Sequence, residues 1–330
     1  MPTPKIAVII PFFQRETGIL RRALASIAAQ TFAADRLYVL LIDDGSPVAA
    51  EAELIQHPSP EGLRIVLIRQ HNRGPNEARN TGLDNLEPGT DLVAFLDSDD
   101  EWIGDHLRRA VTALACGYTA YFANLFHLGD SVNEFEKAKR VRPAEHPAIG
   151  NDPTLRAYQG DMVHQIATAN IIFMPSLVID AAVLGAARFP MAHRHGGGDY
   201  LYWMNLIHHG ARFAFSTEPE VRCGRGINMW YASGWGTDGL ALRIVDEARF
   251  RRTVLLRHAT APQTVASLQT RIAQLQGSML QDVVHRLRRR KKIDWNAVKV
   301  MFQENPPTLS TVRHVATALY SKATGRSKRT

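Results

Sequence analysis

Three carboxylates stand directly after an apolar run in the stretch Val93 to Trp102, which reads Val-Ala-Phe-Leu-Asp-Ser-Asp-Asp-Glu-Trp. Carboxylates this close repel one another unless a cation lies among them, and hard cations such as Mg²⁺ and Mn²⁺ prefer carboxylate oxygens. The apolar residues favour a buried strand, which would carry Asp97, Asp99 and Asp100 to one edge of a sheet. The pattern predicts a divalent-cation site with positions open for phosphate oxygens. The alternative is a solvated acidic turn that caps the next helix.

A second candidate group is Asp199, which follows three consecutive glycines. The glycines allow a tight backbone course, and the apolar residues Leu201, Met204 and Ile207 have helical spacing. This places Asp199 at the N-terminus of a helix. Aspartate is a favoured helix cap, so the position by itself requires no catalytic role.

Alternating strand and helix patterns must position these residues. Continuous apolar runs typical of buried parallel strands are found at 5–11, 37–42, 63–68 and 92–96, and helical patterns at 20–28, 49–56 and 76–86. Such alternation predicts right-handed βαβ units, and hence an α/β fold with a mostly parallel sheet covered by helices on both faces. Ligands of open sheets of this kind bind beyond the carboxyl ends of the strands.

Polar clusters follow each of the four predicted strands. They are Pro11 to Arg15, Asp43 to Ser46, Asn72 to Gly82 and Asp97 to Asp100. An aromatic ring and a carboxylate can bind a nucleotide base, and an arginine can bind a diphosphate. Each cluster alone has an ordinary explanation, such as a turn or a surface arginine, but four at consecutive strand ends indicate a nucleotide site.

Together these segments resemble the family 2 glycosyltransferases. The resemblance is carried by Val-Ile-Ile-Pro-Phe-Phe-Gln-Arg, Ile-Asp-Asp-Gly-Ser, Asn-Arg-Gly-Pro-Asn-Glu-Ala-Arg-Asn-Thr-Gly and Phe-Leu-Asp-Ser-Asp-Asp-Glu-Trp, and it extends over about residues 5–215. It implies the GT-A fold, a Rossmann-like sheet, and sugar transfer from a nucleotide sugar with inversion. A narrower similarity, to transferases of bacterial succinoglycan-type exopolysaccharides, implies UDP-glucose as donor.

The resemblance also assigns roles to particular residues. The implied nucleotide-sugar site consists of Pro11, Phe13, Arg15, Asp44, Arg79, Asp97, Ser98 and Asp99. Asp44 would contact the base, and Asp97 and Asp99 would hold Mn²⁺ or Mg²⁺ on the diphosphate. Asp199 would be the catalytic base. Relatives often have Tyr in place of Phe13 and Asn in place of Gln14, so stacking is kept but a phenolic contact is lost.

The second half is expected to bind the acceptor. A helix at 103–116 and a strand at 119–126 precede a long polar stretch, 127–162, which we interpret as an acceptor-side excursion. Candidate acceptor or lid residues are Asp100, His195, Trp203, Trp230 and Trp235. The tryptophans could instead be buried between layers. Histidines near 193–195 and 208–209 lack cysteine partners, which disfavours a zinc site, although one near the proposed base could touch substrate or the cation.

The charge distribution separates the last part of the chain from the rest. Residues 1–248 hold 22 Lys/Arg against 29 Asp/Glu, whereas residues 249–330 hold 17 against 3. We therefore predict a transferase domain at 1–240, with a nucleotide half (1–102) and an acceptor half (103–240), and a basic helical extension at 241–330. The extension is expected to contact an anionic membrane surface. Two cysteines and no hydrophobic leader suggest a cytoplasmic protein, peripheral on the membrane.

The leading hypothesis is a metal-dependent inverting transferase that extends a glycan or a lipid-linked oligosaccharide. The alternatives are a nucleotidyltransferase that makes sugar nucleotides and a non-catalytic glycan-binding protein of the same fold. The first would need a glycine-rich phosphate loop after the first strand, where this chain has Phe12-Phe13-Gln14. Nucleic-acid binding rests on the basic tail alone and is not expected. The sequence does not indicate an oligomeric state.

Overall fold

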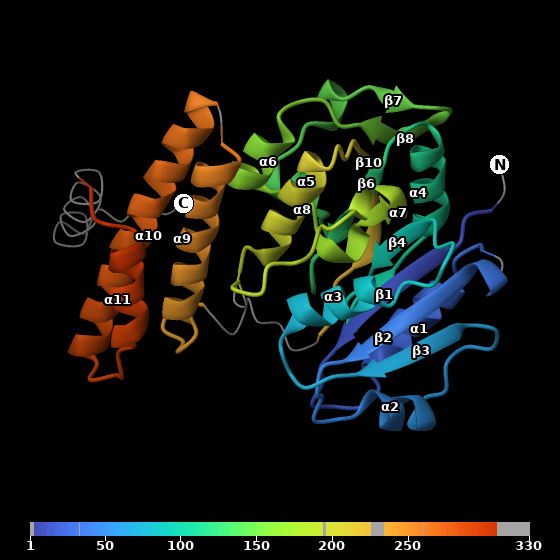
Figure 1. Cartoon of the computed structure of the whole chain (residues 1–330), viewed down its shortest axis with the longest axis horizontal. Helices are drawn as coiled ribbons and strands as arrows, with labels where there is room; N and C mark the ends of the chain where they lie inside the picture. Colours follow the sequence, from blue (N-terminus) through green and yellow to red (C-terminus); the bar gives the residue numbers. More distant parts are fainter. Residues whose placement is uncertain (1–2, 33, 194–195, 226–233, 260, 309–330) are drawn as a thin grey trace. The chain divides into compact units, whose positions relative to one another are not determined.

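The computed structural model describes residues 3–32, 34–193, 196–225, 234–259 and 261–308. The chain divides into two compact units (Figure 1). The first takes in residues 1–162, 169–191 and 202–227, and the second takes in 163–168, 192–201 and 228–330. The second unit therefore includes three segments from the part of the sequence predicted to be the acceptor half, at 163–168, 192–201 and 228–240. The domain boundary at residue 240 stays a prediction.

The elements alternate through the first 115 residues as the sequence pattern predicts. They are β1 (Ile6–Phe12), α1 (Leu20–Ala28), η1 (Ala34–Arg36), β2 (Leu37–Asp43), α2 (Ala50–Gln56), β3 (Arg64–Arg69), α3 (Pro75–Asp84), β4 (Leu92–Phe95), β5 (Glu101–Trp102) and α4 (His106–Ala115). Each predicted strand and helix of this region is confirmed within a few residues.

The following elements are shorter and more irregular. They are β6 (Ala120–Phe126), α5 (Glu134–Ala138), η2 (Pro143–Glu145), β7 (Ala148–Ile149), β8 (Asp152–Ala157), α6 (Met162–Ala169), η3 (Met174–Ser176), β9 (Val178–Asp180), α7 (Ala181–Leu184), α8 (Gly198–His208) and β10 (Phe213–Arg222). The polar stretch 127–162, which showed no pattern in the sequence, contains the two short strands β7 and β8.

The described strands form one sheet in the order β3-β2-β1-β4-β9-β6-β10-β8-β7, with β5 paired to β10. β1 lies between β2 and β4 and is parallel to both, with Ile6 opposite Leu37 and Leu92. β9 runs antiparallel between β4 and β6, and β10 is parallel to β6. The central sheet with helices on both sides confirms the predicted fold class.

The two faces of β1 pack against different helices. Ile6, Val8 and Ile10 belong to a core that also contains buried residues of α1 and α4. Ile9 points to the other face, toward α3, where a Cβ on Gly82 would lie 2.6 Å from the Ile9 side chain. The sheet is thus buried on both faces, which explains why its strands read as unbroken apolar runs.

A buried polar network ties α4 to the sheet. Glu220 of β10 is 2% exposed and accepts hydrogen bonds from the hydroxyl of Tyr121 and from Nη1 of Arg109, at 2.8 and 3.2 Å. Its Oε2 lies 2.8 Å from Nδ1 of the fully buried His106. Since α4 follows the carboxylate motif, this network fixes the helix behind the candidate site.

β9 and β10 were not foreseen from the sequence. The apolar run 166–187 is interrupted by Asn170, Pro175 and Asp180, and this pattern predicts a strand, a break and a helix. The structure instead has the end of α6, the three-residue β9 and the short α7 there. β10 carries alternating polar residues at Ser216, Glu218 and Glu220, which weakens its apolar signal. Both are placed by pairing with strands distant in sequence.

The second unit consists mainly of α9 (Leu240–Arg257), α10 (Pro262–Arg288) and α11 (Trp295–Glu304), drawn in orange to red in Figure 1. Ile244 and Val245 of α9, Leu275 and Met279 of α10 and Met301 of α11 form its core. These helices confirm the expected helical extension. The sequence also predicts a short helix at 311–320, which lies outside the described residues.

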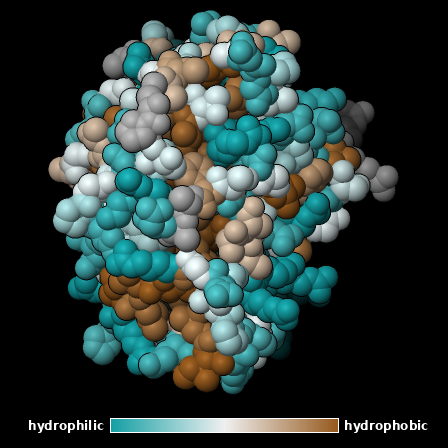
Figure 2. Space-filling model, turned by 90° about the vertical axis from the view of Figure 1, so that its right-hand side faces the viewer, coloured by the Kyte–Doolittle hydropathy of each residue, from teal (hydrophilic) through white to brown (hydrophobic). Residues whose placement is uncertain are grey.

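In the part of the chain that the structure describes, none of the helices combines the length and apolar character needed to cross a bilayer. On the face shown in Figure 2, hydrophilic residues predominate and hydrophobic residues gather in separate patches.

Candidate active site

The carboxyl end of β2 carries two adjacent aspartates with different surroundings. Asp43 accepts hydrogen bonds from the backbone N–H groups of Ser46 and Ala50, at 2.8 and 2.9 Å. Ala50 is the first residue of α2, so Asp43 stabilises the turn into that helix. Asp43 therefore has a structural role at this turn, and ligand binding by Asp44 stays a prediction.

Asp44 is 2% exposed and held by three donors. Its Oδ1 accepts from Nε2 of Gln70 and from the backbone N–H of Arg73, at 2.7 and 2.9 Å, and its Oδ2 accepts from the N–H of Gly74 at 2.8 Å. Gln70 is itself fixed, because its Oε1 accepts from the Thr81 hydroxyl at 2.6 Å. The carboxylate orientation is thus set before any ligand binds.

Arg79 and Asp97 form an ion pair between α3 and the end of β4. Nη2 of Arg79 lies 2.6 Å from Oδ1 of Asp97, and the guanidinium stands over the Phe189 ring at 5.7 Å. The Arg79 Nε is buried and has no hydrogen-bond partner among the described residues. The Asp97 side chain is 33% exposed, so a ligand can reach it.

A hydrogen-bonded chain joins the ends of three strands. The backbone N–H of Gln14 donates to Oγ of Ser46 at 2.7 Å, and Nε2 of Gln14 donates to Oγ of Ser98 at 3.0 Å. Gln14 and Ser98 are both buried. The structure therefore brings together segments that follow β1, β2 and β4.

Other predicted residues line the start of this region. Pro11 and Phe13 are half-buried, and Arg15 is exposed. Their contacts with a nucleotide stay predictions.

Asp100 is buried beside the other two carboxylates of the motif. It accepts a hydrogen bond from the backbone N–H of Gly224 at 2.9 Å. Burial, followed by the charges on Asp97 and Asp99, raises the pKa of Asp100 well above its usual range. The cluster thus holds more negative charge than its surroundings neutralise.

These residues fit a divalent cation. Asp97 and Asp99 offer hard oxygen ligands. The pKa of Asp100 is raised mainly by burial and secondly by repulsion from Asp97 and Asp99, and a cation would relieve that repulsion. Within the described residues, no three metal-ligating side chains form a cluster. A cation held here would therefore take further ligands from a diphosphate and from water, as Mg²⁺ commonly does.

The sequence comparisons decide the family. Residues 7–178, more than half of the chain, match the family model described as glycosyl transferase family 2. The chain belongs to glycosyl transferase family 2.

Two relatives are similar in sequence to the transferase. It is 35% identical to the succinoglycan biosynthesis protein ExoW of Rhizobium meliloti over 237 residues, and the aligned region is 69% of this chain and 71% of ExoW. It is 32% identical over 123 residues to GalNAc(5)-diNAcBac-PP-undecaprenol beta-1,3-glucosyltransferase of Campylobacter jejuni, covering 38% of that protein.

Solved structures share the fold of the transferase at low sequence identity. Residues 1–349 of Staphylococcus aureus TarS, in complex with UDP-GlcNAc, superpose with a TM-score of 0.57 at 18% identity, covering 98% of this chain and 93% of that one. The mannosyltransferase PcManGT of Pyrobaculum calidifontis, in complex with GDP-Man and Mn²⁺, gives 0.53 at 19% identity, covering 96% and 80%. These comparisons confirm the GT-A fold, and glycosyltransferases of this fold generally use a divalent cation.

Asp199 lies in the first turn of α8, and its Oδ1 accepts from the N–H of Tyr200 at 3.0 Å. A Cβ on Gly197 would lie 2.6 Å from Cβ of Phe250, and the Tyr200 ring packs edge-on against Phe250 at 5.2 Å. These contacts explain the glycine at position 197, since only glycine fits this close approach with a φ of +80°. Asp199 belongs to the second unit, and its convergence with Asp44 and Asp99 stays a prediction.

The remaining acceptor and lid candidates differ in exposure. Trp203 is fully buried, so its ring has no exposed face to offer an acceptor, and it fits the structural alternative. Trp235 is 53% exposed and lies near the His285 ring. His195 and Trp230 lie outside the described residues.

Three residues of the transferase site were missed in the sequence. Gly224 approaches the motif so closely that a Cβ there would lie 1.6 Å from the Asp99 carbonyl oxygen and 2.8 Å from Arg22 Nη2. The apolar spacing of 20–28 predicts that Arg22 lies on the outer side of its helix, away from the sheet. Gln70 has no sequence signal except that it follows a predicted strand. The glycines near Cys223 predict a hinged loop and not a close approach to the motif.

Proposed function

We propose that this family 2 enzyme is an inverting hexosyltransferase that moves glucose from UDP-glucose to a hydroxyl of a growing glycan. The observation that carries the proposal is the carboxyl edge of the sheet, where Asp44, the Arg79–Asp97 pair and the Asp99–Asp100 cluster follow neighbouring strands or pack beside them. TarS, which has the same fold, is known in complex with UDP-GlcNAc and with UDP.

The donor would be held by the first unit. Phe13 would stack on the base while Asp44 accepts a hydrogen bond from it, and Gln70, Arg73 and Gly74 keep that carboxylate in place. Arg79 would bind the diphosphate through the donors that its bond to Asp97 leaves available. Asp97 and Asp99 would hold Mn²⁺ or Mg²⁺, which neutralises charge on the leaving phosphate when bound.

Asp199 would act as the general base. As the acceptor oxygen forms its bond to the anomeric carbon, the hydroxyl proton passes to the Asp199 carboxylate, and the bond to the nucleoside diphosphate breaks on the opposite face. This sequence inverts the configuration of the sugar. The N-terminal position in α8 keeps the carboxylate at the end of a helix, where its charge is stabilised.

The acceptor we propose is a lipid-linked oligosaccharide in exopolysaccharide biosynthesis. ExoW is a succinoglycan biosynthesis protein, and the Campylobacter relative is named for an acceptor on undecaprenyl diphosphate. The basic run 286–292 would hold the enzyme at an anionic membrane surface, with Leu287 and Trp295, 58% and 60% exposed, as apolar contacts. Arg286 is excluded from this surface, because it is buried and pairs with Asp282 at 2.7 Å.

The decisive experiment measures UDP release and sugar transfer with a panel of UDP- and GDP-sugars in the presence of Mn²⁺, with and without EDTA. We expect turnover with UDP-glucose that EDTA abolishes, and a product of inverted configuration. Pyrophosphate-dependent exchange would instead identify a nucleotidyltransferase. No release from any sugar nucleotide would indicate a glycan-binding protein.

Membrane contact is tested separately by sedimentation with anionic vesicles. The full chain should sediment, and a chain without residues 260–330 should remain in solution. Equal sedimentation of both would exclude the helical extension as the membrane-binding part.

A further inference from the structure

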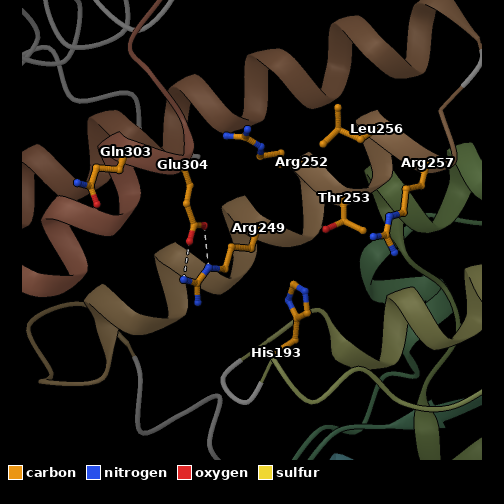
Figure 3. Close-up of a pocket in the computed structure, with 8 residues that line it drawn as sticks. All are labelled: His193, Arg249, Arg252, Thr253, Leu256, Arg257, Gln303 and Glu304. Carbon is orange, nitrogen blue, oxygen red and sulfur yellow. Dashed lines mark hydrogen bonds and ion pairs between the residues drawn. The ribbon is translucent and has the colours of Figure 1, made fainter.

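A hollow of about 490 Å³ lies on the second unit, outside the residues assigned to donor binding (Figure 3). α9 supplies Arg249, Arg252, Thr253 and Arg257 to its lining. Arg249, Thr253 and Arg257 are four residues apart and follow one side of the helix, whereas Arg252 lies about 140° around the helix axis from Arg257, at the opposite margin of the lining. His193 lines the same hollow from the loop before α8.

The hollow has surplus positive charge. Arg249 is neutralised, since its Nε and Nη2 donate to the Glu304 carboxylate of α11 at 2.7 and 2.6 Å. It also lies 3.7 Å from Asp246. Arg252 and Arg257 are exposed, and neither forms an ion pair or a side-chain hydrogen bond with any residue that the structure describes. Two guanidinium groups are therefore available to an anion.

Their spacing suits an extended dianion. Residues five apart on a helix are separated by about 7.5 Å along its axis, so one carboxylate does not reach both backbone positions at once. Guanidinium groups bind phosphate oxygens in pairs of parallel hydrogen bonds, and the Thr253 hydroxyl adds a neutral donor between them. A diphosphate matches the charge, and its two phosphates could each meet one of the two guanidinium groups.

The hollow is built onto the segment of the candidate base. His193 precedes Asp199 by six residues, and Phe250, which packs against Gly197 and Tyr200, is next to Arg249 in α9. Burial lowers the pKa of His193, so the hollow gains little charge from it at neutral pH. A group bound here would be held by the same helix that supports Asp199.

We propose that this hollow is a second phosphate-binding site, which takes the diphosphate group of the acceptor through Arg252 and Arg257. The inference rests on the proposed function for the identity of the anion, but binding itself does not depend on catalysis. It assigns α9 a role in acceptor recognition that is distinct from membrane contact by residues 288–292.

The test is calorimetric titration of the full chain with inorganic pyrophosphate, in EDTA and with saturating UDP so that the donor site does not contribute. The variant Arg252→Gln/Arg257→Gln should bind pyrophosphate at least tenfold more weakly. The control Arg288→Gln/Arg289→Gln changes the same net charge at exposed positions and should bind within twofold of the parent. Equal weakening of both variants, unchanged binding by the first, or no binding by the parent would overturn the proposal.

A second measurement separates a lipid headgroup from a free diphosphate. Residues 288–292 are expected to bind anionic vesicles in both proteins, so the measured quantity is the difference between them. Vesicles of phosphatidylcholine with phosphatidic acid should sediment a smaller fraction of Arg252→Gln/Arg257→Gln than of the parent if the hollow takes phosphates at a membrane. Equal sedimentation, with weakened pyrophosphate binding, would assign the site to a free anion. UDP-glucose turnover by the parent is measured separately. Absence of turnover would contradict the proposed function, whereas the conclusion about pyrophosphate binding would not change.

Discussion

The carboxylate edge of the first unit and the arginine hollow of the second both gather like charges, but they hold them by different means. At the edge, backbone N–H groups of Gly74 and Gly224 donate to Asp44 and Asp100, and the side chains of Gln70 and Arg79 add donors to Asp44 and Asp97. In the hollow, Arg249 is held by the side chain of Glu304.

The difference shows which substitutions each region tolerates. A group held by backbone donors depends on the path of a loop, so a methyl group added to a glycine can displace it. A group held by a side chain depends on one partner, and loss of that partner costs in proportion to its burial.

The largest expected effect is a loss of kcat on substitution of Asp199. It tests whether a residue of the second unit takes part in catalysis, in addition to the carboxylates of the first unit. Asp199→Asn keeps a helix-capping side chain but removes the base, so kcat should fall by about 10²- to 10⁴-fold. UDP affinity should stay within twofold of the parent. Asp180→Asn is the matched control, because Asp180 caps α7 through the N–H of Ala182. Near-parent turnover by Asp199→Asn would leave Asp199 as a cap alone.

The next largest effect is a loss of stability. It tests whether removing a buried carboxylate that pairs with other side chains lowers the free energy of unfolding more than removing an exposed one. Glu220→Gln leaves Arg109 and His106 without a carboxylate in a buried network, and we expect a loss of about 2 to 4 kcal/mol in the free energy of unfolding. Urea unfolding followed by circular dichroism measures it. Glu218→Gln changes an exposed carboxylate of the same strand and should cost little. Equal stability of the two variants would contradict the argument.

Gly224→Ala tests the backbone-held region. Its Cβ would overlap the Asp99 carbonyl, so the segment must move and Asp100 loses its N–H donor. We expect at least about tenfold weaker binding of UDP with Mn²⁺, about 1.4 kcal/mol, measured by titration calorimetry. The control Gly89→Ala adds a methyl group where no atom lies within 4 Å of the new Cβ, at a positive φ that Gly224 does not have, and should leave UDP affinity within twofold of the parent. Unchanged UDP affinity would show that the loop is independent of the motif.

The smallest expected effect is the loss of stability on removing the Arg249–Glu304 ion pair, which joins α9 and α11. The hydrogen bonds from Arg249 lower the pKa of Glu304, so this pair stabilises the protein above the ordinary glutamate pKa of 4.5, and the stabilisation is lost as the pH falls through the lowered value. Because both side chains are about one-third exposed, Glu304→Gln should cost only about 0.5 kcal/mol at pH 7 after solvent screening. The Tm difference from the parent should shrink at pH 3. A constant difference would assign the loss to packing.

Much of the fold could be predicted from the sequence, because buried parallel strands are recognised as apolar runs. The polar residues that end each strand come immediately after its run in the sequence. This located Asp44, Asp97 and Asp99 without tertiary information. The strands β7, β8 and β10 could not be predicted in the same way, since short or alternating strands are stabilised by neighbours far along the chain. The contact of Gly224 with Asp100 spans 124 residues and has no local signature.

The sequence by itself determined the family, the order of strands and helices in the nucleotide half and the carboxylates at the strand ends, because each depends on residues adjacent in the chain. Tertiary structure decided that Asp43 supports a turn while Asp44 is held by Gln70, Arg73 and Gly74, and that Trp203 belongs to the core. It also placed Arg252 and Arg257 around a hollow with His193. These outcomes depend on which distant groups a fold brings within hydrogen-bonding distance, and a linear pattern does not contain that information.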